Sequence, residues 1–74
     1  MTVRIIQEYD RKYNAVLIED DGRVLNDSRA DVPGQVSYGR LRVLLRINFH
    51  ITIPALGEIS FKKKGYRRYA ELKV

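Results

Sequence analysis

The chain has 74 residues with 14 Lys or Arg, nine Asp or Glu and a formal net charge of +5. This length suits one small domain spanning residues 1–74, and the absence of cysteine excludes disulfides. No apolar run approaches the roughly 20 residues of a membrane span, and the first residues lack the apolar segment of a signal peptide. We therefore expect a cytoplasmic protein that does not enter a membrane, and a homodimer would enlarge its small core.

Positive charge is concentrated in the second half of the chain. Residues 1–37 contain five Lys or Arg and seven Asp or Glu, a net charge of −2, whereas residues 38–74 contain nine and two, a net charge of +7. A surface of such positive charge attracts polyanions, chiefly nucleic acid. The alternative is that the excess lysines serve only solubility.

In chain order, residues 3–9 are rich in β-branched side chains and predict a first strand. Residues 13–20 predict a second strand, buried on both faces around Ala15 to Ile18. Asp21-Gly22 is a turn that favours positive φ, and residues 23–25 return as a third strand. Residues 26–38 show no regular pattern, although Pro33-Gly34 predicts a turn and residues 35–38 could form an edge strand.

Residues 40–53 show the strongest pattern in the chain. Apolar side chains stand at every odd position from 41 to 53, and all the even positions except Leu44 are polar. This alternation predicts one long strand with an apolar face and a basic face formed by Arg40, Arg42, Arg46 and His50. A helix is the rejected alternative, because it would place Asn48 on the apolar stripe and leave Val43 and Ile47 outside it.

The last third of the chain predicts two more strands. Residues 58–62 place Ile59 and Phe61 on one face, and residues 66–74 alternate up to the C-terminus. Short strands with tight turns and little helix predict an all-β fold, a small barrel or roll of five to six strands of the OB-like or SH3-like kind.

The eight residues from Lys62 to Tyr69 contain five positive charges and two aromatic rings. Lysine and arginine neutralise phosphates, and tyrosine stacks on unpaired bases. Alternatively, the lysines only protect a sheet edge from aggregation. The predicted nucleic-acid contacts are Arg40, Arg42 and Arg46 along a phosphate track, Lys62, Lys63, Lys64, Arg67 and Arg68 on phosphates, and Tyr66 or Tyr69 on a base. Together these residues would form one continuous cationic surface.

Metal and catalytic chemistry have weaker support in the sequence. A single histidine without cysteine cannot complete a zinc site in a monomer, so no metal or other cofactor is expected. His50 could serve as the base of a ribonuclease, but a hydrogen-bonded structural histidine is the more ordinary reading, and we expect no enzyme. The acidic run Glu19-Asp20-Asp21 alternates between faces and is best explained as a charged hairpin tip.

Two stretches resemble a cold-shock domain. Residues 9–12 with 14–22 are similar to the start of that family, and residues 56–61, 64–65 and 70–72 are similar to its last two strands. The resemblance implies a five-stranded OB-type barrel. It does not transfer the family's RNA-binding aromatics, because Ala15 and Leu17 stand in the first motif, Glu8 replaces the preceding Trp, and residues 24–27 lack the Phe and His of the second.

The sequence thus predicts a small basic protein that binds single-stranded RNA or DNA through its C-terminal half. The alternative is a phage- or plasmid-type regulator or inhibitor that binds a protein. A strand over residues 40–53 would be about 46 Å long, longer than a small domain is wide. In this alternative it would dimerise or pair with a partner through that strand.

Overall fold

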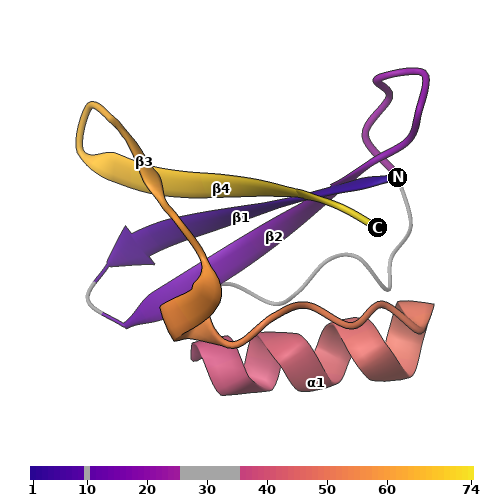
Figure 1. Ribbon diagram of the computed structural model, residues 1–74, viewed down its shortest axis with the longest axis horizontal. Helices are drawn as coiled ribbons and strands as arrows, with labels where there is room; N and C mark the ends of the chain where they lie inside the picture. The colour runs from indigo at the N-terminus through magenta and orange to yellow at the C-terminus, as the bar shows by residue number, and fades with distance from the viewer. Residues whose placement is uncertain (10, 26–35) are drawn as a thin grey trace.

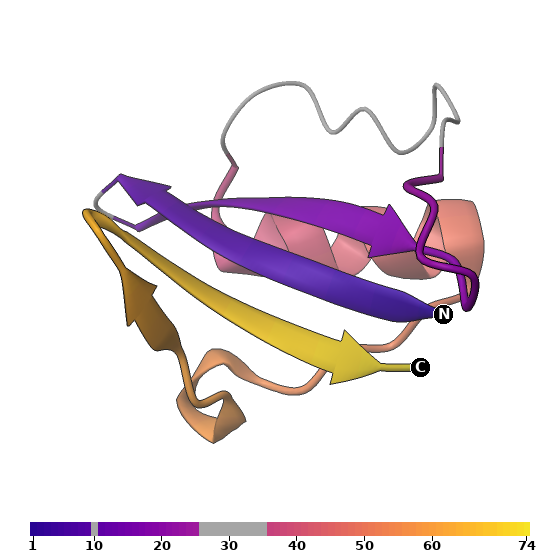
Figure 2. The same ribbon diagram turned by 90° about the horizontal axis from the view of Figure 1, so that it is seen from above.

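The computed structural model describes residues 1–9, 11–25 and 36–74. Within these ranges four strands form one antiparallel sheet in the order β2-β1-β4-β3, with one α-helix on one side of it (Figures 1 and 2). The strands are β1 (Thr2–Tyr9), β2 (Lys12–Ile18), β3 (Lys62–Lys64) and β4 (Arg67–Lys73), and the helices are α1 (Tyr38–Phe49) and the 3₁₀ turn η2 (Leu56–Glu58).

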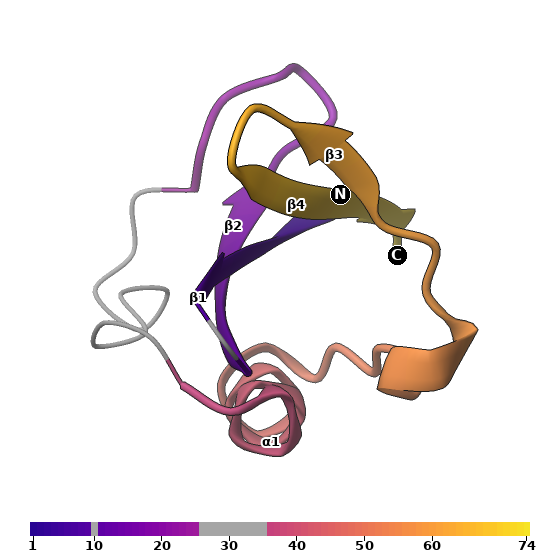
Figure 3. The ribbon, with the colours of Figure 1, turned by 90° about the vertical axis from the view of Figure 1, so that its left-hand side faces the viewer.

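The core lies between α1 and one face of the sheet, and the described chain leaves the opposite face without a covering helix (Figure 3). Alternation along each strand sends every second side chain toward α1. The buried side chains are Val3 and Ile5 from β1, Tyr13, Ala15 and Leu17 from β2, Ala70 from β4, Tyr38, Leu41 and Leu45 from α1, and Ile51 and Ile53 beyond it. The sheet therefore has a packed face and an uncovered face.

The predicted long strand over residues 40–53 is wrong, because most of this stretch is helix α1. The side chain of Ser37 accepts a hydrogen bond from the backbone N–H of Arg40 at 3.3 Å, which caps the first turn. Leu41 and Leu45 are buried, whereas Val43 and Ile47, on the same face of the predicted strand, are 39% and 65% exposed. The helix thus buries only some of the apolar side chains that the predicted strand would have placed on one face.

The helix ends at His50, which adopts a left-handed conformation with φ 56°. Its backbone N–H donates to the carbonyl of Arg46 at 3.0 Å, and the N–H of Ile51 donates to the carbonyl of Leu45 at 3.2 Å. These bonds satisfy carbonyls of the last turn that would otherwise lack partners. Beyond this cap the chain is extended, and there the predicted alternation holds: Ile51 and Ile53 are buried and Thr52 is exposed.

The remaining strand predictions are confirmed in part. Residues 2–9, 12–18 and 67–73 are strands, close to the predicted ranges. The predicted third strand over residues 23–25 is reduced to one bridge between Ile18 and Val24. Of the predicted strand over residues 58–62, only Lys62 lies in a strand, β3, and residues 58–61 form the end of η2 and an irregular segment. Val36 bridges Tyr13, but Tyr38 already belongs to α1. The predicted turn at Pro33-Gly34 lies outside the described residues.

A small β-rich fold is confirmed, but the predicted closed barrel of five to six strands is wrong for the described chain. The four strands of the described chain form a sheet with β2 at one edge and β3 at the other, so the sheet does not close. The segment that would have supplied the longest strand instead packs as a helix. The protein-pairing alternative loses the long strand as an argument and stays a prediction. In the described ranges no helix has the length and apolar character needed to cross a membrane.

Candidate nucleic-acid interface

The β3–β4 hairpin presents most of the predicted contact residues. Gly65 occupies the turn with φ 63°, a conformation that glycine adopts without steric cost, and Tyr66 beside it is fully exposed at the tip. Across the hairpin Lys63 lies opposite Arg68 and Lys64 lies opposite Arg67. Like charges placed directly opposite on neighbouring strands repel each other. The hairpin therefore carries two pairs of like charge at opposite register positions.

Strand alternation divides the hairpin's side chains between the two faces of the sheet. Ala70 belongs to the packed face, so Tyr69 and Arg67 project from the uncovered face. Their register partners Lys62 and Lys64 project with them, and Ile6 of β1 lies opposite Tyr69 on its other side. Lys63 and Arg68 point to the other side of the hairpin. The cationic and aromatic residues from Lys62 to Tyr69 are thus divided between the two faces of the sheet. Those on the uncovered face lie around the half-buried Tyr69.

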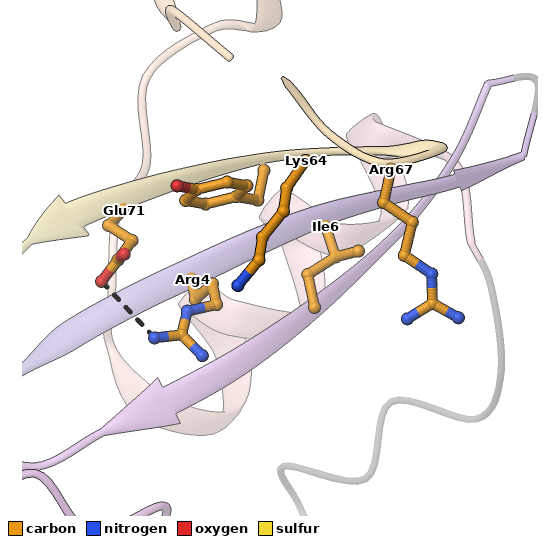
Figure 4. A pocket seen from close by; sticks show the side chains of 6 residues that line it. Arg4, Ile6, Lys64, Arg67 and Glu71 are labelled. Atoms are coloured by element: carbon orange, nitrogen blue, oxygen red, sulfur yellow. Dashed lines mark ion pairs between the residues drawn. The ribbon is translucent and has the colours of Figure 1, made fainter. Parts of the chain in front are cut away.

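A hollow of about 270 Å³ opens on the uncovered face (Figure 4). Its lining comes from three strands: Arg4 and Ile6 of β1, Lys64 of β3, and Arg67, Tyr69 and Glu71 of β4. We call these six residues the sheet hollow. Side chains from both sheet centre and hairpin therefore meet around one space.

Two ion pairs lie in and beside the sheet hollow. Arg4 Nη2 is 3.7 Å from Glu71 Oε2, and Arg67 Nη2 is 3.4 Å from Glu8 Oε2. The Arg4 and Glu71 side chains are almost half exposed, whereas that of Glu8 is only 14% exposed. Within the described chain Lys62, Lys63, Lys64 and Arg68 form no ion pair. The hairpin thus keeps an excess of uncompensated positive charge.

The three helix arginines lie elsewhere. Arg40, Arg42 and Arg46 are exposed on α1, in the layer that covers the packed face of the sheet (Figure 3). Arg42 and Arg46, one turn apart, line a second hollow of about 200 Å³ between α1 and the extended segment that contains Thr52 and Ile53. The predicted continuous cationic surface is therefore wrong. A strand would have aligned these arginines with the hairpin, but the helix places them in a separate layer.

The remaining polar candidates have structural roles. His50 is exposed and its backbone ends α1. The run Glu19-Asp20-Asp21 lies at a turn, where Arg23 pairs with Asp21 at 2.6 Å and Gly22 has φ 89°. A hydrogen bond from the N-terminal amine, 2.6 Å away, lowers the pKa of the Asp20 carboxyl. The described residues contain no group of three side chains placed to hold a metal ion.

Sequence reasoning missed four members of this region: Arg4, Ile6, Glu8 and Glu71. The first three alternate along β1 and therefore share one face, a pattern visible in the sequence. What was missing was the pairing of β1 with β4, which brings a strand from each end of the chain together. Residues nearly 70 positions apart in sequence, such as Arg4 and Glu71, cannot be paired by local patterns alone.

Comparison with models of known families, with curated proteins and with solved structures finds no significant match to this chain. The resemblance to cold-shock domains stays a prediction.

Proposed function

We propose that this protein binds single-stranded nucleic acid through the β3–β4 hairpin and the adjoining uncovered face of its sheet. The main observation is the register of the hairpin, which places Lys63 opposite Arg68 and Lys64 opposite Arg67 and so gathers positive charge on both of its strands. Mutual repulsion costs stability, and phosphate groups would offset that cost by neutralising both strands.

The uncovered face supplies a second component of the interface. Tyr69 and Ile6 offer an apolar surface beside these cations. An unpaired base presents a flat apolar ring next to its phosphate, so it matches a surface that combines aromatic and cationic side chains. The contacts would be mainly to phosphate and tolerant of sequence, with RNA and DNA both as candidate ligands.

The helix arginines contribute, in this proposal, at most a second and separate contact. Arg40, Arg42 and Arg46 stay predicted phosphate ligands. However, a nucleic-acid strand bound on the uncovered face of the sheet would have to pass around the edge of the molecule to reach them. Cytoplasmic location and a homodimer likewise remain predictions, and light scattering measures the second directly.

Salt dependence is the primary test. For a labelled ten-nucleotide single strand, about five neutralised phosphates give a slope of about −3.5 in log affinity against log salt. Affinity would then fall about a hundredfold between roughly 50 and 200 mM salt. Affinity that is absent, or that does not change over this range, contradicts the proposal. The 260/280 nm absorbance ratio of the purified protein gives an independent indication of copurifying nucleic acid.

A further inference from the structure

The sheet hollow is small and chemically mixed. Its volume of about 270 Å³ lies near the lower end of the roughly 300–1,000 Å³ range of small-molecule sites. Ile6 and Tyr69, register partners across β1 and β4, supply apolar surface, and Lys64 and Arg67, register partners across the hairpin, supply positive charge beside it. The space thus combines an aromatic surface with two cations within one hairpin.

The two tyrosines of the motif differ in their surroundings. Tyr66 is fully exposed at the hairpin tip, whereas Tyr69 is half-buried between Ile6 on β1 and Lys62 on β3. A ring held by neighbouring strands loses less conformational freedom on binding than a ring at a free tip. Tyr69 is therefore the better stacking surface, although the sequence alone treats both rings alike.

We propose that the sheet hollow is a subsite for one unpaired nucleotide, an inference that rests on the proposed function. The base stacks on Tyr69 against Ile6, and its phosphate lies between Lys64 and Arg67. The Arg4–Glu71 pair borders the base edge with both hydrogen-bond donors and acceptors. A base inside a duplex has both faces covered by its neighbours, so the subsite selects single strands over duplexes.

Photo-crosslinking of the unaltered protein tests this assignment directly. The probe is a pyrimidine decamer containing 5-bromouracil, irradiated at low salt, digested with trypsin and analysed by mass spectrometry. Trypsin cleavage leaves Tyr69 in the peptide 69–73 and Tyr66 in the separate peptide 65–67. We expect the crosslinked base on the peptide 69–73. Crosslinks confined to the peptide 65–67 or to peptides of α1 would overturn the subsite.

Affinity measurements provide the second test, in which the effect of Tyr69→Leu is compared with that of the same substitution at the other tyrosine of the hairpin, Tyr66→Leu. Loss of stacking at Tyr69 is expected to weaken single-strand binding about tenfold to a hundredfold and to leave the salt slope unchanged, because no phosphate contact is removed. Tyr66→Leu should weaken single-strand binding by less than Tyr69→Leu does, and equal losses would contradict the subsite. The affinity of Tyr69→Leu for a duplex of the same length should change less than threefold. Circular dichroism verifies that both variants are folded.

The outcomes separate the subsite from the proposed function. If the original protein binds the decamer with a steep salt slope and Tyr69→Leu, once shown to be folded, binds equally well, the subsite is wrong and phosphate binding stands. If the original protein does not bind the decamer, the proposed function fails and the subsite fails with it. Should Tyr69→Leu not fold, the crosslinked peptide of the unaltered protein decides.

Discussion

Glu8 of β1 and Arg67 of β4 form an ion pair across the uncovered face of the sheet, with 3.4 Å between Glu8 Oε2 and Arg67 Nη2. Arg67 also lies opposite Lys64 in the hairpin, so the same guanidinium belongs both to this ion pair and to the proposed phosphate site. In the proposed function the carboxylate of Glu8 would therefore compete with a phosphate for Arg67.

Replacing Glu8 with Gln is expected to strengthen nucleic-acid binding. The substitution frees Arg67 and removes one negative charge beside the sheet hollow. A partly exposed ion pair contributes up to about 1 kcal/mol, so the gain in affinity should be about two- to fivefold at low salt. Fluorescence anisotropy with the labelled single strand measures the change.

The matched control is Asp21→Asn, which makes the same change in net charge at the turn between residues 19 and 23. A gain of equal size in both variants would mean that only net charge matters. Weaker binding by Glu8→Gln would show that the carboxylate positions Arg67 for the ligand instead of competing with it.

A second prediction concerns the helix. Leu41 is fully buried in the core, and truncation of such a side chain to Ala should destabilise the fold by about 2–5 kcal/mol. Ile47 is 65% exposed, so Ile47→Ala should change the free energy of unfolding by less than about 0.5 kcal/mol. Urea denaturation measures both values. Equal losses would contradict the helix, because the two side chains share a face only if residues 41–47 form a strand.

Two exposed apolar residues of the helix explain why the sequence predicted the wrong element. Val43 and Ile47 are apolar yet exposed, so they complete an alternating pattern that the core does not use. The helix buries Leu41 and Leu45 and leaves the half-buried Asn48 and Leu44 at its margin. Ser37 was available in the sequence as an N-cap signal, but β-branched residues after it favoured the strand. The left-handed conformation of His50 is visible only in the structure.

The sequence predicted the hairpin part of the candidate site but not the part contributed by β1, for a related reason. The hairpin residues from Lys62 to Tyr69 are adjacent in sequence, and a local motif is enough to group them. The grouping with Arg4 and Glu8 depends on β1 lying next to β4, which is a property of the whole sheet. The inclusion of Arg40, Arg42 and Arg46 depended on the strand assignment and failed with it.

Tyr38 gives a prediction about alkaline stability. Its hydroxyl donates to the carbonyl of Pro54 at 2.5 Å and thereby connects α1 to the segment that follows it. Burial is the main cause that raises the pKa of this hydroxyl above 10.0. The contribution of the protonated hydroxyl to stability is therefore complete below pH 10 and is lost as the pH rises through the raised value.

Tyr38→Phe should accordingly cost about 0.5–1.5 kcal/mol at pH 7, because the Pro54 carbonyl loses its donor. The difference from the original protein should shrink above pH 10, where the phenolate can no longer donate. Urea denaturation at pH 7 and pH 11 measures both differences, with the fully exposed Tyr66→Phe as control. A difference that is the same at both pH values would contradict the proposed role of the hydroxyl.

The final prediction compares the two cationic regions with variants of equal charge. One variant changes Lys62, Lys64 and Arg67 on the uncovered sheet face to Gln, and the other changes Arg40, Arg42 and Arg46 on α1 to Gln. Both lose three positive charges, so any long-range electrostatic effect is similar in the two. The sheet-face variant should lose most of the direct phosphate contacts, and its salt slope should become shallower by about 2, at about 0.7 for each contact on a single strand. The helix variant should bind more weakly at low salt but keep most of its slope.

A larger loss of slope in the helix variant would move the interface to α1, and equal losses would indicate that the ligand contacts both layers.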